Sequence, residues 1–188
     1  FRTKNRPIAS GKVSIKIAIM YVFILCLLAL LVLLKFNLFT IILALGSMPL
    51  AFSYPLMKRF TYWPQLFLGI TFNYGLILGW TAIKGQIEPV AIILYIGAIF
   101  WTLGYDTIYG FQDIKDDEII GLKSTSIKFK KEPYFFLYTC YSFYLITLLV
   151  TGYLIELNYI SIIFFIIALY QMFYYQLQKL KIKNSSSC

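Results

Sequence analysis

Four of the eight acidic residues lie in one short segment at the end of a long apolar run. Asp106 is near the end of that run, and Asp113, Asp116 and Asp117 follow it. Carboxylates are costly at a membrane edge, so their concentration there predicts a functional site. Magnesium is usually bound by one or two carboxylates together with the phosphate oxygens of a substrate. The segment therefore indicates a Mg²⁺ site for an anionic substrate that carries a lipid tail.

A helix projected through residues 90–117, which contain no proline, places these side chains on one stripe. Asp113 and Asp117 are four residues apart and should share a face. Asp106 should lie roughly 10 Å deeper in the bilayer than Asp113, at a rise of 1.5 Å per residue. We expect Asp113, Asp116 and Asp117 to be the metal ligands. The alternative is a solvated helix end whose charges balance neighbouring lysines.

Basic residues at the ends of the apolar runs are candidates for binding the remaining oxygens of a diphosphate. They are Arg2, Arg6, Lys58, Arg59 and Lys123. Arginine can bind two oxygens at once, whereas lysine acts as a point charge. The alternative for Lys58 and Arg59 is an ordinary signal of membrane topology. The segment around Lys123 resembles the end of a phosphate loop, but it lacks the upstream glycine and the preceding strand of a nucleotide site.

The composition is typical of a protein solvated by lipid, because 60% of the 188 residues are hydrophobic and 13% are charged. Helices are the expected solution, since backbone polar groups in lipid must pair within the chain. We predict an all-α, polytopic transmembrane bundle that forms a single domain over residues 1–188. Six uncharged runs are long enough to span a bilayer. They are Ile17–Leu34, Phe36–Met57, Phe60–Ile83, Pro89–Tyr105, Pro133–Ile155 and Leu157–Gln178.

The distribution of lysine and arginine predicts the orientation in the membrane. All of these residues except Lys35 and Lys84 lie before the first run, after the last, or in alternate connections. The positive-inside rule then places both chain ends and the Asp113–Asp117 segment in the cytoplasm or its organelle equivalent. Basic loops beside anionic lipid account for the net charge of +9, so we expect no nucleic-acid partner. The sequence contains no histidine, which excludes a Ser-His-Asp triad.

Three blocks of sequence resemble the UbiA-type intramembrane prenyltransferases. Their order and spacing cover nearly the whole chain, and the second and third together point to the branch that acts on 4-hydroxybenzoate in ubiquinone synthesis. The Tyr-Asp-Thr-x-Tyr pattern at residues 105–109 argues against relatives that use a haem or naphthoate acceptor. The blocks are Arg2–Gly11, Tyr54–Gln65 with Leu68 and Gly69, and Tyr105–Asp117 continuing to Gly121–Thr125.

The resemblance implies a bundle of nine helices with two aspartate-rich motifs, which together bind magnesium and a polyprenyl diphosphate. Asp113 and Asp117 match the second motif. The first, of the form Asn-Asp-x-x-Asp-x-x-x-Asp, should precede Arg2, yet the sequence has no acidic residue before Glu88. The six runs would correspond to helices three to eight of the family. We therefore expect a chain that is incomplete at both ends and has little or no activity alone.

The expected reaction joins a polyprenyl group to the ring carbon beside the hydroxyl of 4-hydroxybenzoate. Departure of the diphosphate leaves an allylic carbocation, which a cavity in the bilayer protects from water. Aromatic faces can stabilise positive charge, so Tyr105 and Tyr109 are candidates for that role. Asp106 could orient the acceptor or take its proton. The alternative is a structural aspartate that is paired or reaches the membrane surface.

Two other interpretations remain open. A six-helix transporter subunit would explain helix-breaking residues such as Pro49, Pro55 and Pro64, but it should also show an inverted repeat, and none is evident. A truncated gene product could keep the structure without the function. For the location, ubiquinone synthesis predicts a bacterial inner membrane, and a mitochondrial inner membrane is the less favoured alternative.

Overall fold

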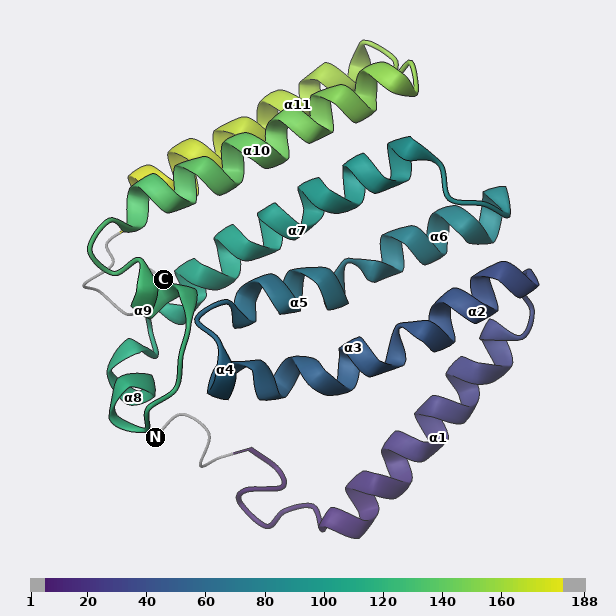
Figure 1. Cartoon of the computed structure of the whole chain (residues 1–188), viewed down its shortest axis with the longest axis vertical. Coiled ribbons are helices and arrows are strands. Elements are labelled where there is room, and N and C mark those ends of the chain that lie inside the picture. The colour runs from purple at the N-terminus through teal and green to yellow at the C-terminus, as the bar shows by residue number, and fades with distance from the viewer. Residues whose placement is uncertain (1–5, 181–188) are drawn as a thin grey trace.

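The computed structural model describes residues 6–180, and every regular element in that range is a helix (Figure 1). Six of its segments are long and apolar enough to cross a membrane. This confirms the predicted all-α fold with six spans. Arg2 lies outside the described residues. The spans are Ile15–Leu33, Leu38–Phe60, Pro64–Lys84, Pro89–Gly110, Pro133–Leu154 and Ile160–Gln178.

Several spans consist of more than one helical element. The first three spans contain α1 (Ile15–Leu33), α2 (Leu38–Gly46), α3 (Met48–Ser53), the 3₁₀ turn η1 (Tyr54–Leu56), α4 (Met57–Phe60), α5 (Pro64–Phe72) and α6 (Tyr74–Lys84). The remaining elements are α7 (Pro89–Gly110), α8 (Ile114–Ile119), α9 (Thr125–Lys128), α10 (Pro133–Leu154), α11 (Ile160–Leu169) and the π-helical η2 (Tyr170–Gln178).

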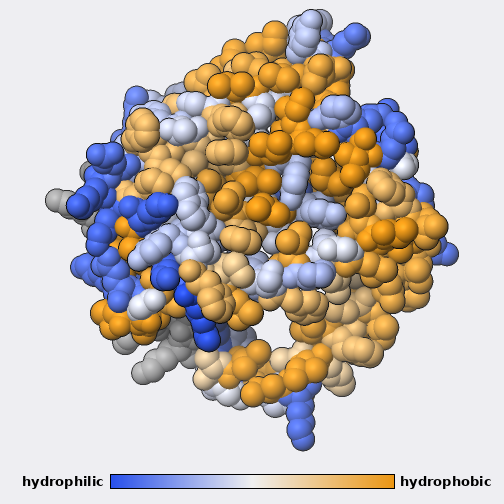
Figure 2. Space-filling model, in the orientation of Figure 1, coloured by the Kyte–Doolittle hydropathy of each residue, from blue (hydrophilic) through white to orange (hydrophobic). Residues whose placement is uncertain are grey.

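The short helices α4, α8 and α9 lie together at one end of the bundle, and the connections α6–α7 and α10–α11 lie at the other end (Figure 1). Hydrophilic residues gather over the end that carries the short helices, whereas hydrophobic residues cover most of the spanning helices (Figure 2). The acidic segment and the Lys58–Arg59 pair are therefore at the same end of the bundle, as the sequence predicts.

The third span is interrupted in mid-membrane at Asn73, where α5 ends and α6 begins. The Asn73 side-chain amide donates to the carbonyl oxygens of Gly69 and Ala98, at 2.8 and 3.1 Å, and to Thr102 Oγ1 at 2.7 Å. A polar group at this depth needs such partners, because no water is available to it. Asn73 therefore connects the broken span to α7.

The core forms where α7 packs between α5 and α10 (Figure 1). Two glycines of α7 allow α10 to approach closely. A Cβ atom on Gly104 would lie 2.4 Å from Tyr141 Cε1, and one on Gly97 would lie 1.9 Å from Thr147 Oγ1. Small residues permit this kind of contact between helices in membranes. Because α7 is fixed on both sides, the position of Asp106 within it is fixed as well.

Gly104→Ala should destabilise the bundle by about 1–3 kcal/mol, because the buried Tyr141 ring has to move to admit a methyl group. Thermal unfolding of the detergent-solubilised protein measures the effect. Gly79→Ala is the matched control, since a Cβ atom at Gly79 meets nothing within 4 Å. Equal melting temperatures for the two variants would show that α10 packs less closely against Gly104 than the structure indicates.

Candidate functional site

The continuous helix projected through residue 117 is wrong, because α7 ends at Gly110 and α8 begins at Ile114. The intervening turn is tight: the Phe111 and Asp113 N–H groups donate to the carbonyls of Ile108 and Gly110, three residues earlier. Phe111 is buried in the core and anchors the turn. Glycine also favours a break, since it is a poor helix former. The depth calculated for Asp106 relative to Asp113 from one helix therefore does not apply.

The pairing of Asp113 with Asp117 survives this break. The Asp117 N–H donates to the Asp113 carbonyl at 2.8 Å, so the two residues are one helical turn apart. Asp117 is buried, with 8% of its surface exposed, whereas Asp116 is exposed. Within residues 6–180, no three acidic, histidine or cysteine side chains gather as a metal cluster. The metal-binding role of Asp113, Asp116 and Asp117 stays a prediction.

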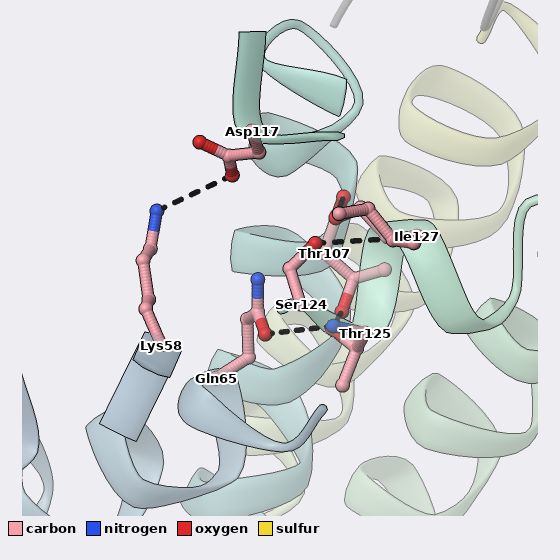
Figure 3. Close-up of polar contacts among 8 residues, drawn as sticks. Lys58, Gln65, Thr107, Asp117, Ser124, Thr125 and Ile127 are labelled. Carbon is pink, nitrogen blue, oxygen red and sulfur yellow. Dashed lines mark hydrogen bonds and ion pairs between the residues drawn. The ribbon is translucent and has the colours of Figure 1, made fainter. Parts of the chain in front are cut away.

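Lys58 is a predicted cation that forms an ion pair with this acidic segment. Its Nζ lies 3.7 Å from Asp117 Oδ2, and its side chain is 44% exposed while that of Asp117 is 11% exposed (Figure 3). Lys58 therefore faces the carboxylate of Asp117, a contact that sequence spacing alone does not show.

The backbone of Lys123 is hydrogen-bonded to that of Lys58. Its N–H donates to the Lys58 carbonyl at 2.8 Å, while its Nζ donates to the Phe60 carbonyl at 3.4 Å and lies 5.6 Å from the centre of the Tyr62 ring. Gly121, which follows α8, has a φ of 72°, a left-handed conformation that favours glycine and lets the chain turn back. The loop after α8 is thus attached to the end of α4.

Arg6 and Arg59 are both exposed, and neither forms an ion pair within the described part of the chain. Arg6 borders an apolar hollow together with Ile17 and Tyr21 of α1. The structure therefore places Lys58 beside Asp117 and the backbone of Lys123 beside Lys58. The role of the two arginines in binding a diphosphate stays a prediction.

The three candidates for catalysis lie in the last two turns of α7. Asp106 is partly buried, and Tyr105 packs against Trp101 with ring centres 4.9 Å apart. Tyr109 is 49% exposed. The side chains are thus available at the end of the membrane span, and their roles stay predictions.

Sequence reasoning missed a group of buried polar residues beneath the acidic segment. It consists of Gln65, Thr107, Thr125 and Ser126, which come from α5, α7 and α9. All four residues lie within the three sequence blocks that resemble the family, or directly after them, but sequence reasoning predicts no role for them. The available signal was the Thr125–Ser126 pair, since polar residues of this kind can bond backbone groups where a helix begins.

A family model described as the UbiA prenyltransferase family matches residues 1–188. The chain belongs to this family. The resemblance found in the sequence is therefore confirmed. UbiA prenyltransferases generally depend on a divalent metal. No solved structure matches the chain.

Curated relatives of the chain carry names from the 4-hydroxybenzoate branch. The 4-hydroxybenzoate polyprenyltransferase, mitochondrial, of Homo sapiens is 53% identical over 129 residues, which are 68% of this chain and 35% of that protein. The enzyme of that name from Arabidopsis thaliana is 51% identical over 68% of this chain and 32% of its own length. The 4-hydroxybenzoate geranyltransferase 2 of Lithospermum erythrorhizon is 49% identical over 68% of this chain and 42% of its own length. The match thus spans about a third of the polyprenyltransferases' length.

Proposed function

We propose that this protein, as one membrane-embedded domain over residues 1–188, acts in an intramembrane aromatic prenyltransferase of ubiquinone biosynthesis. The reaction transfers a polyprenyl group from polyprenyl diphosphate to 4-hydroxybenzoate and depends on Mg²⁺. The observation that carries the proposal is the buried carboxylate of Asp117, which faces Lys58 Nζ at 3.7 Å where α7 leaves the membrane. Family membership and the names of the relatives support the same reaction.

The residues present fit a magnesium site that the substrate completes. Asp113 and Asp117 are one helical turn apart, and they would supply the one or two carboxylates that magnesium usually takes from a protein. A bound divalent cation would neutralise the diphosphate and so favour its departure. Asp116 is exposed in the same helix and is a further candidate ligand for the cation.

The chain's own side chains would bind the anion and hold the acceptor. Lys58, half-buried beside Asp117, supplies a positive charge for the diphosphate, and Lys123, Arg59, Arg6 and Arg2 are further candidates for this role. Asp106 would orient 4-hydroxybenzoate or take its proton. Tyr105 and Tyr109 would place aromatic faces near the developing positive charge. The apolar helices would exclude water from it.

The proposal puts the end that carries α8 in the cytoplasm or its organelle equivalent, because the basic residues concentrate there. The sequence favours a bacterial inner membrane, and the names of several relatives, which are mitochondrial enzymes, favour the mitochondrial alternative. Both locations give the site the same orientation. Fractionation of the source cells distinguishes them.

Membranes that carry the protein, expressed from its entire reading frame, provide the test. We expect them to prenylate 4-hydroxybenzoate with polyprenyl diphosphate, to lose that activity with a chelator and to regain it with Mg²⁺. A naphthoate and a haem precursor serve as competing acceptors. Transfer to one of these instead would assign the chain to another branch of the family. Substrate transport without any prenylated product would support a transporter subunit.

Lys58→Met should raise the KM for polyprenyl diphosphate about 10- to 100-fold, because it removes a positive charge beside Asp117. Lys58→Arg should retain most of the affinity, since it keeps the charge. Initial rates measured against diphosphate concentration check both expectations. Lys130→Met is the control, because Lys130 is exposed and pairs with the exposed Glu118. An unchanged KM in Lys58→Met would remove Lys58 from the anion site.

A further inference from the structure

Gln65, Thr107, Thr125 and Ser126 form a buried polar cluster, here called the polar latch. Each of the four residues has 3% or less of its surface exposed. Buried polar groups destabilise a protein unless they are hydrogen-bonded, so a fully bonded cluster specifies one arrangement of the elements that contribute to it. In this case the elements are the beginning of α5, the last turns of α7 and the short helix α9.

Thr107 is the centre of the latch. Its hydroxyl donates to the Leu103 carbonyl at 2.6 Å, so its oxygen accepts from the Thr125 hydroxyl, which lies 2.6 Å away. The Ser126 hydroxyl donates to the Thr107 carbonyl at 2.8 Å. The Thr125 backbone N–H donates to Gln65 Oε1 at 3.0 Å, which ties α9 to α5 (Figure 3).

The latch holds both ends of the segment that carries the acidic residues. This segment, residues 111–124, leaves α7 at Gly110 and re-enters the bundle at Thr125. Gly110 packs so closely that an added Cβ atom would lie 2.3 Å from Ser126 Oγ. The segment therefore begins and ends within the same buried cluster.

The same cluster also fixes the basic side of the site. Gln65 lies in the first turn of α5, directly after the loop that follows α4 and Lys58. The Lys123 N–H donates to the Lys58 carbonyl two residues before Thr125. The distance between Lys58 and Asp117 thus depends on how α9 is seated against α5 and α7.

We propose that the polar latch is a positioning network that holds Asp117 and Lys123 in register with Lys58 and so sets the affinity for the diphosphate group of the substrate. This inference rests on the proposed function. The latch residues act through these three side chains, and binding groups held in place before the ligand arrives lose less entropy on binding.

Thr125→Val tests the proposal, because valine keeps the branched shape and removes only the hydroxyl donor. We expect the KM for polyprenyl diphosphate to rise about tenfold, which corresponds to one lost hydrogen bond. The kcat and the KM for 4-hydroxybenzoate should stay within about twofold. Thr125→Ser restores the donor and should recover most of the affinity. A purely structural role would instead lower the amount of active enzyme and leave KM unchanged.

Thr139→Val is the matched control, since the Thr139 hydroxyl donates within α10 and is exposed. Ser126→Ala is a second latch variant, because it removes the hydroxyl that donates to the Thr107 carbonyl. A KM for polyprenyl diphosphate within twofold of the wild type in both latch variants would overturn the proposal.

Hydrogen exchange of the detergent-solubilised protein separates failure of the latch from failure of the proposed function. Thr125→Val should speed exchange in residues 111–124 at least about fivefold and leave α10 unchanged. If the wild type prenylates nothing, the proposed function fails, and exchange alone then decides whether the latch fixes the segment. Unchanged exchange in residues 111–124 would overturn the latch in either case.

Discussion

Asp117→Asn is expected to lower kcat/KM for prenyl transfer by about 10²- to 10³-fold. The substitution keeps the size of the side chain but removes its negative charge from a buried position. A divalent cation would lose one of its two carboxylates, and Lys58 would lose the partner that faces it at 3.7 Å. Prenylation of labelled 4-hydroxybenzoate by membranes that carry the variant measures the change.

Glu118→Gln is the matched control for Asp117→Asn. Glu118 is the next residue in α8, but it is exposed and pairs with Lys130 and not with Lys58. We expect its kcat/KM to stay within about twofold of the wild type, as surface ion pairs contribute little. A similar loss of kcat/KM in both variants would mean that the reaction depends on the total negative charge of α8. The position of Asp117 would then have no special role.

The six spans could be predicted because each span is determined locally. An uncharged run of sufficient length has to pair its backbone as a helix, whatever its neighbours are. The pairing of Asp113 with Asp117 could be predicted for the same reason, since residues four apart share a face of any helix. The hydrogen bond between their backbones confirms that they lie one turn apart.

Gly110 weakens a helix locally, but the break there could not be predicted from that alone because it depends on contacts between distant segments. The space beside Gly110 is filled by Ser126, and the turn after it is held by the burial of Phe111. The bond between Thr125 and Gln65 likewise joins residues sixty positions apart. The interruption at Asn73 has the same origin, since the amide bonds α7 at Ala98 and Thr102. Local pattern carries no information about which partners such side chains find.

Asp106→Asn is expected to lower kcat about 10²-fold while the KM for polyprenyl diphosphate stays within about twofold. Asp106 is partly buried in α7, inside the membrane span. An ionised carboxylate inside a membrane span destabilises the protein, so its presence there indicates a functional role. Asparagine fills the same volume but cannot take a proton from the acceptor. Steady-state kinetics of the protein from its entire reading frame separate the two constants.

The split between kcat and KM distinguishes the role of Asp106 from that of Asp117. If Asp106 is only a paired structural residue, its loss should lower thermal stability, and kcat for the folded fraction should remain near the wild-type value. If it serves the acceptor, kcat falls and the melting temperature changes little. Glu132→Gln is the control, since Glu132 is an exposed acid at the same end of the bundle. Full turnover in Asp106→Asn would leave this aspartate a structural residue, and the proton from the acceptor would have to go elsewhere.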